Sequence, residues 1–111
     1  MTKQSCCETS WFKIYMAGDY FVAKQHIREF CIFNNVCINI YKTDYIYRGG
    51  EESGFCVEII NYPKYPEKEQ TLQTLAIILA EELLIKCCQK SYTVASANET
   101  CYYSREDELG R

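Results

Sequence analysis

Alternation of apolar and polar positions predicts a chain of short β-strands interrupted by two helices. Aromatic and β-branched residues, which favour strands, are dense in these stretches. The fourth and fifth strands are separated only by a short turn and should form a hairpin. The predicted strands cover residues 11–16, 36–41 (with a bend at 42–44 and a strand that resumes, or begins anew, at 45–47), 55–60, 91–94 and 100–104.

The two helices are predicted over residues 20–34 and 67–89 from apolar positions at helical spacing. Asp19 suits the N-cap of the first helix, because its side chain can accept from free backbone N–H groups. The second helix is apolar on more than one side, which is typical of a helix buried on two sides. We expect its second side to form a contact in a homo-oligomer; the alternative is a central helix buried within one chain.

The element order is therefore β-α-β-β-α-β with one strand appended. This order predicts an α+β fold, with two helices on one face of a mainly antiparallel sheet, as in ferredoxin-like proteins. The length suits a single domain, which we place at 11–105. Residues 1–10 are expected to form a disordered lead, and residues 106–111 a charged tail.

Charge and composition argue against several classes of function. The net charge of −3 argues against general nucleic-acid binding, which usually needs a basic surplus. No apolar run is long enough to span a membrane, and the first ten residues lack the apolar core of a signal peptide. We therefore expect a cytoplasmic protein with no membrane contact.

The eight cysteines are interpreted as reduced thiols. Four of them (Cys31, Cys37, Cys56 and Cys101) are expected to pack as small core residues. The single histidine, His26, is expected on a helix surface. Adjacent cysteine pairs chelate poorly and no second histidine is available, so we predict neither a metal site nor a cofactor.

The most unusual stretch runs from Tyr45 to Pro63 and contains a glycine-rich polar segment between two aromatic, apolar runs. Backbone N–H groups and an arginine could hold a phosphate, adjacent carboxylates could accept from ribose hydroxyls, and tyrosines could stack on a base. The spacing is not that of a P-loop, and a solvated hairpin tip is the alternative. The ligand-binding candidates here are Tyr45, Tyr47, Arg48, Gly49, Gly50 and Glu51, with Glu52 as an alternative carboxylate.

A second group of candidates follows the next strand. Asn61, Tyr62 and Lys64 lie at the mouth of a turn, and Arg105 ends the last strand, where a neighbouring subunit could reach it. The alternative for Asn61 is a cap or turn residue. A ligand-binding protein should have a pocket that joins Arg48, Asn61 and tyrosines, either within one chain or across subunits. We find no pairing of nucleophile and base, and predict no catalytic residue.

The segments IYMAGD (14–19), TDYIYRGGEESG (43–54) and INYPKYP (60–66) resemble those of small proteins encoded by phages and prophages, over about residues 12–105. The chain is also similar to phage anti-Thoeris sponges, which bind cyclic ADP-ribose signals and so silence a bacterial defence system. This resemblance implies a counter-defence protein that sequesters a nucleotide-like molecule in the host cytoplasm without chemistry. The alternatives are a protein that inhibits a host protein by surface contact and, third, a small enzyme.

Overall fold

The computed structural model describes residues 1–105 and shows five strands and two helices in the predicted order. The strands differ in length, and the two longest, at residues 38–47 and 50–60, form a hairpin. The elements are β1 (Trp11–Ala17), α1 (Tyr20–Phe33), β2 (Ile38–Tyr47), β3 (Gly50–Ile60), α2 (Glu69–Lys86), β4 (Ser91–Ser96) and β5 (Thr100–Ser104).

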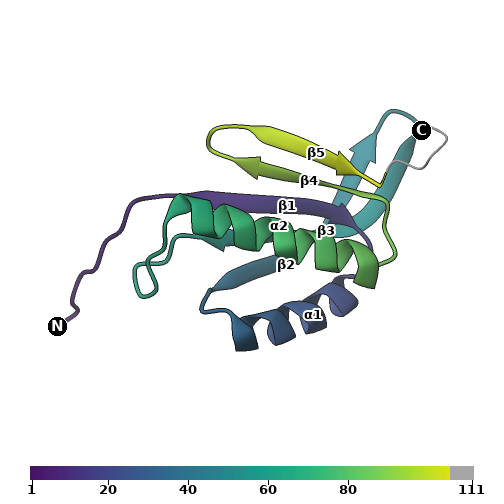
Figure 1. Ribbon diagram of the computed structural model, residues 1–111. Helices are drawn as coiled ribbons and strands as arrows, with labels where there is room; N and C mark the ends of the chain where they lie inside the picture. The colour runs from purple at the N-terminus through teal and green to yellow at the C-terminus, as the bar shows by residue number, and fades with distance from the viewer. Residues whose placement is uncertain (106–111) are drawn as a thin grey trace.

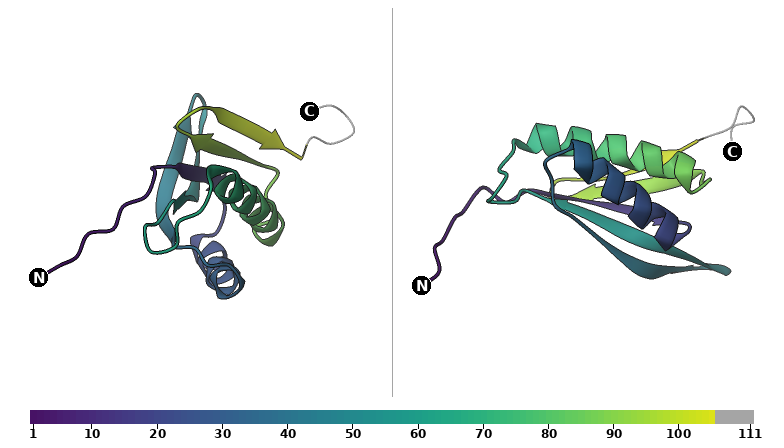
Figure 2. Two further views of the ribbon diagram at one scale, coloured as in Figure 1. Left: turned by 60° about the vertical axis from the view of Figure 1, so that its left-hand side comes forward. Right: turned by 90° about the horizontal axis from the view of Figure 1, so that it is seen from below.

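All five strands form one antiparallel sheet with the order β2-β3-β1-β4-β5. Both helices lie on the same side of this sheet, and the views in Figure 1 and Figure 2 agree on this. The order places β1 at the centre, between β3 and β4, with β5 added at one edge. The predicted α+β fold with two helices on one face, including the extra C-terminal strand, is confirmed.

The core lies between the helices and one face of the sheet. Along β1, the residues at even positions are buried while their neighbours are only partly covered. The same period of two continues in β4, where Tyr92 and Val94 are buried, as expected for a strand with one covered face. In β3, by contrast, the four consecutive residues from Gly54 to Val57 are all buried. Leu72, Leu79 and Leu83 of α2 meet this face and are at most 1% exposed.

Asp19 caps α1 as predicted. Its carboxylate accepts hydrogen bonds from the backbone N–H groups of Phe21 (2.8 Å) and Val22 (3.2 Å). These are two of the four N–H groups that the first turn of a helix leaves unpaired. Gly18 precedes the cap at a φ of +133°, a conformation that favours glycine. The turn from β1 into α1 is therefore encoded locally by Gly18 and Asp19.

The glycine-rich loop is shorter than predicted. Ten consecutive residue pairs join β2 to β3, from Ile38 opposite Ile59 to Tyr47 opposite Gly50. The bend predicted at 42–44 is therefore ordinary strand, and only Arg48 and Gly49 form the turn. Pairing with a long neighbour overrides the low strand propensity of Gly50, Glu51, Glu52 and Ser53.

Helix α2 is also shorter than predicted, because the chain leaves the helix at Cys87. Its second side remains exposed in the single chain, with Ile78 and Ile85 44% and 65% accessible. The prediction that this side forms a contact between subunits stays a prediction.

Two side chains, those of His26 and Cys37, differ in exposure from the prediction. His26 is more covered than expected for a surface histidine: its side chain is 13% exposed, and its Nε2 lies 2.6 Å from Oε1 of Glu82, a contact that joins α1 to α2. Cys37 is exposed because it precedes the first residue of β2, whereas Cys56 is buried and Cys31 and Cys101 are partly buried. All eight cysteines are free thiols.

Residues 1–10 form no helix or strand, and the predicted charged tail at 106–111 lies outside the described residues. In the part of the chain that the structure describes, none of the helices is both long and apolar enough to span a bilayer.

Candidate functional site

The face of the sheet opposite the helices carries no helix in the part of the chain that the structure describes (Figure 2). Side chains that alternate with the core residues point to this side, and in register they lie next to one another across the strands. The open face is rich in aromatic and hydroxyl groups. It includes Trp11, Lys13 and Tyr15 of β1, Tyr41, Thr43, Tyr45 and Tyr47 of β2, Glu52, Cys56 and Glu58 of β3, Ser91 and Thr93 of β4, and Tyr102 and Ser104 of β5.

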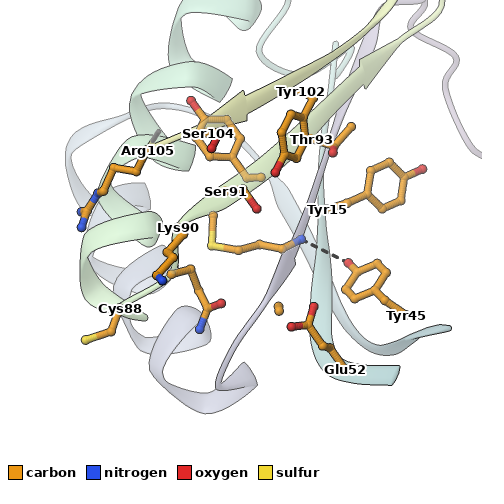
Figure 3. Close-up of a pocket in the computed structure, with 14 residues that line it drawn as sticks. Tyr15, Tyr45, Glu52, Cys88, Lys90, Ser91, Thr93, Tyr102, Ser104 and Arg105 are labelled. Carbon is orange, nitrogen blue, oxygen red and sulfur yellow. Dashed lines mark hydrogen bonds between the residues drawn. The ribbon is translucent and has the colours of Figure 1, made fainter. Parts of the chain in front are cut away.

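One end of this face is hollowed into a pocket of about 990 Å³, close to the upper size of small-molecule sites. Strands β1 and β4 form its floor, the β2–β3 hairpin and β5 flank it, and the loop after α2 closes one end. Figure 3 shows the lining side chains, with Tyr15, Tyr45 and Glu52 on one side and Cys88, Lys90 and Arg105 on the other. The lining includes Tyr15, Tyr45, Glu52, Cys88, Gln89, Lys90, Ser91, Thr93, Tyr102, Ser104 and Arg105.

Tyr45 is hydrogen-bonded at the pocket to two neighbouring strands, β1 and β3. Its hydroxyl donates to the backbone C=O of Phe55 (2.5 Å) and accepts from the N–H of Met16 (3.2 Å). Its ring lies over Gly54, where an added Cβ would come within 2.8 Å of the ring and 2.3 Å of the Met16 carbonyl oxygen. The missing side chain at Gly54 therefore makes room for Tyr45. Burial raises the pKa of Tyr45 to about 12, so the phenol stays neutral and keeps its hydrogen at neutral pH.

The loop that carries Lys90 is positioned by the end of α2. Cys88 adopts a left-handed φ of 54°, and the N–H of Gln89 donates to Leu84 while that of Cys88 donates to Ile85. These two bonds form the arrangement that commonly ends a helix with a left-handed residue. Lys90 in turn accepts a backbone hydrogen bond of 2.6 Å from Arg105, so the two cationic residues are adjacent.

Charge is distributed unevenly within the pocket. Glu52 lies beside Tyr45 on one flank, while Lys90 and Arg105 lie toward the other (Figure 3). The tyrosine rings of the lining offer faces on which a planar base can stack, and the serine and threonine hydroxyls both donate and accept. A carboxylate accepts from two adjacent hydroxyls, and a lysine with an arginine attracts an anion. Such a set suits a polar molecule that carries a heterocycle and a sugar.

Of the residues predicted from the sequence to bind a ligand, Tyr45 and Arg105 line this pocket, and so does Glu52, the alternative carboxylate. Tyr47, Arg48, Gly49, Gly50 and Glu51 form the tip of the hairpin. Gly49 takes a positive φ of 84°, and at Gly50 an added Cβ would lie 2.5 Å from the ring of Tyr47. These two glycines are thus explained by the turn and by the position of one tyrosine ring.

Asn61, Tyr62 and Lys64 lie beyond the opposite end of β3. The eleven residues of β3 separate them from Arg48 by roughly 35 Å, so one chain does not join Asn61 and Arg48 in a pocket. The Nδ2 of Asn61 donates to the C=O of Glu8 (2.7 Å), and its Oδ1 accepts from the N–H of Glu67 (2.9 Å). Asn61 therefore ties the N-terminal segment to the chain before α2.

The two tyrosines beside Asn61 pack on each other. The rings of Tyr62 and Tyr65 stack with centroids 5.9 Å apart, and Lys64 lies over Tyr65 at 5.9 Å. These contacts close a turn between Tyr62 and Tyr65. A cap or turn residue was the alternative interpretation of Asn61.

Sequence reasoning missed most of the pocket. The alternation of β1 could have marked Tyr15, and the two-residue turn would have placed Glu52 opposite Tyr45 and Glu51 on the other face. No local signal brings Lys90, Thr93 and Tyr102 to these residues, because that requires the order of the strands in the sheet.

In residues 1–105, no three His, Cys, Asp or Glu side chains gather in a way that would hold a metal ion. The described lining of the pocket includes no histidine.

Comparisons with known proteins bear on the fold. No protein-family model matches the chain, and no curated protein does. Two solved structures match nearly whole chains. A phage SAM lyase in complex with S-methyl-5′-thioadenosine has a TM-score of 0.61 at 10% identity, over 94% of this chain and 95% of that one. A phage SAM lyase in its apo state has a TM-score of 0.53 at 15% identity, over 86% and 88%.

The chain shares its fold with phage SAM lyase. The sequence resemblance to phage proteins is therefore matched by a similarity of fold to a phage protein. The structure of that phage protein contains a bound nucleoside-derived molecule. Neither similar structure is described as a cyclic ADP-ribose sponge.

Proposed function

We propose that this protein binds an adenosine-derived metabolite in the pocket on the open face of its sheet. The observation that carries the proposal is the grouping of the open-face tyrosines Tyr15, Tyr45 and Tyr102 with Glu52 in a pocket of about 990 Å³. The shared fold supports it, since the similar phage SAM lyase is described in complex with S-methyl-5′-thioadenosine.

Each part of such a ligand has a matching group. The adenine ring would stack on a tyrosine face, with Tyr102 the most exposed candidate at 68%. The ribose diol would donate to the Glu52 carboxylate, which accepts two hydrogen bonds side by side. Ser91, Thr93 and Ser104 supply hydroxyls for the remaining polar atoms.

Within this class, S-adenosylmethionine fits the charges best. Its sulfonium would be favoured by tyrosine faces and by Glu52, and its carboxylate by Lys90 or Arg105. Cleavage would need no protein nucleophile. The carboxylate of the substrate can attack its own γ-carbon, the C–S electron pair leaves with sulfur, and the products are S-methyl-5′-thioadenosine and a lactone with no net proton transfer. The pocket would contribute by folding the substrate and excluding water.

Sequestration of a cyclic ADP-ribose-like nucleotide is the second candidate. The adjacent cations Lys90 and Arg105 favour it, because a diphosphate carries two negative charges that an adenosyl thioether lacks. On this alternative the tyrosines stack the base and no bond is broken.

One experiment separates these candidates. The purified full chain is titrated calorimetrically with S-adenosylmethionine, S-methyl-5′-thioadenosine and cyclic ADP-ribose, and each ligand is then recovered and analysed by chromatography. A ligand at a hundred times its dissociation constant should also stabilise the fold by about 2.7 kcal/mol. Binding with conversion of S-adenosylmethionine indicates a lyase, and binding with intact ligand indicates sequestration. Absence of binding by all three would overturn the proposal and favour inhibition of a host protein by surface contact.

Glu52→Gln is the matching variant, and Glu51→Gln is its control. The two carboxylates are adjacent and exposed but lie on opposite faces of β3. Loss of a charged hydrogen-bond acceptor should weaken binding roughly tenfold to a hundredfold for Glu52→Gln only. Equal effects of the two substitutions would place the ligand away from the open face.

A further inference from the structure

Strand β2 leaves a long edge of the sheet without a partner among the described residues. It is the outermost strand, pairs only with β3, and runs for ten residues without a bulge. Strand edges of this length are usually protected by charged side chains, by proline, by a bulge or by covering segments, because their free N–H and C=O groups recruit other strands. The charged side chains of β2 are one lysine and one aspartate, Lys42 and Asp44, so they do not repel a second copy in every register. β2 contains no proline, and its exposed side chains include Tyr41 (44%) and Ile46 (77%).

The sequence of this edge is complementary to itself. Residues 40–46 read Ile-Tyr-Lys-Thr-Asp-Tyr-Ile, which is symmetric about Thr43 except that a lysine on one side matches an aspartate on the other. An antiparallel copy centred on Thr43 would place Lys42 opposite Asp44 of the second copy, and the reverse. Tyr41 would lie opposite Tyr45, and Ile40 opposite Ile46. Every opposing pair is thus of matched chemistry, with Cβ atoms about 4.5–5.5 Å apart.

Neighbouring registers lack this match. A copy centred on Lys42 would oppose two lysines, and one centred on Asp44 would oppose two aspartates, which is unfavourable for directly facing side chains. The two charged residues share the helix side of the sheet, since Lys42 lies 4.7 Å from the ring of Phe21 in α1. A two-fold axis at Thr43 therefore keeps the helices of both copies on one side and the open faces on the other.

From this complementarity we infer that β2 pairs with β2 of a second copy of this chain, in antiparallel register about Thr43, to form one continuous sheet. The seam adjoins the candidate pocket, because Tyr45 lies on both. The inference does not depend on the proposed function, since it uses only the edge of the sheet.

A charge swap tests this inference in the full-length protein. In a dimer of Lys42→Asp, the new aspartate of each copy would face Asp44 of the other copy. In a dimer of Asp44→Lys, the new lysine of each copy would face Lys42 of the other copy. Each single variant should raise the dimer dissociation constant roughly tenfold or more in analytical ultracentrifugation. An equimolar mixture of the two variants should restore a dimer, as should the double variant, because both arrangements pair opposite charges again.

Two controls keep the test decisive. Lys42 lies over the rings of Phe21 and Tyr20, so circular dichroism must show that Lys42→Asp is folded; Asp44→Lys serves if it is not. Ile85→Lys is the second control, because it alters the exposed side of α2 and leaves the β2 edge unchanged. A monomeric wild type, a trimer, or a dimer that responds only to Ile85→Lys would overturn the inference, and the last result would place the contact on α2.

Discussion

At the scale of single residues, Tyr45 has two roles. Its ring borders the candidate pocket, and its hydroxyl joins the backbones of β1 and β3. The sequence indicated Tyr45 as a ligand-binding residue because it precedes a glycine-rich turn. Its structural role could not be predicted, because Met16 and Gly54 come next to it only when β1 and β3 pair.

Replacing this tyrosine tests the structural role. Tyr45→Phe should lower the free energy of unfolding by about 1–2 kcal/mol, because the Met16 N–H and the Phe55 carbonyl lose a partner in a partly buried place. Urea denaturation measures the loss. The exposed Tyr47→Phe is the control and should change stability by less than about 0.5 kcal/mol. Equal effects would show that the Tyr45 hydroxyl is not the link between the strands.

The raised pKa of Tyr45 predicts a specific dependence on pH. The phenol ionises near pH 10.0 in the unfolded chain, and burial raises its pKa to about 12 in the fold. Its contribution to stability should therefore be complete below pH 10, and be lost as the pH rises to 12. The difference in unfolding free energy between wild type and Tyr45→Phe should shrink over this window. A difference that is constant from pH 9 to about 12 would contradict the raised pKa.

At the scale of elements, hydrophobic alternation was sufficient for strands and helices but not for their ends. The sequence placed Gly50, Glu51, Glu52 and Ser53 in a loop because such residues disfavour strands. In the structure they continue β3, since β2 offers a partner for each of them and their polar side chains are exposed. The α1 boundary was predictable because its cap, Asp19, is encoded in the sequence next to the helix.

The segment between β3 and α2 is held by one amide side chain. Asn61→Ala should lower the free energy of unfolding by about 1–2 kcal/mol, because the hydrogen bonds of the side-chain amide to the backbone of Glu8 and Glu67 are both lost. It should leave the affinity for an adenosine-derived ligand unchanged, because Asn61 lies far from the pocket. Thermal unfolding and calorimetry measure the two effects, with Lys64→Ala as the control. A loss of ligand affinity without loss of stability would restore Asn61 as a ligand residue.

At the scale of the whole molecule, the layered fold was predictable and the site was not. Element order and the number of helices lead to one sheet covered on one side. The pocket, in contrast, gathers Tyr15, Tyr45, Lys90 and Tyr102 from four separate segments. Their proximity depends on the order of strands in the sheet, which short-range periodicity does not encode.

Adjacent residues of α2 test whether the single chain contains the whole core. Leu79 is fully buried, so Leu79→Ala should cost about 2–5 kcal/mol. Ile78 is 44% exposed, and Ile78→Ala should cost less than about 1 kcal/mol at low protein concentration. Urea denaturation at several protein concentrations measures both. A cost for Ile78→Ala that grows with concentration would reveal the predicted subunit contact on α2.

The alternation of β1 has an evolutionary consequence. Tyr15 faces the pocket, while Ile14 and Met16 on either side of it face the core. Mutations can therefore change the pocket-facing side of a strand without altering the volume of the core behind it. On the proposed function, a lineage under selection could change the ligand of this pocket through intermediates that all fold. The residues of β1 that line the pocket and those that pack in the core alternate along the same strand, yet each set can change without the other.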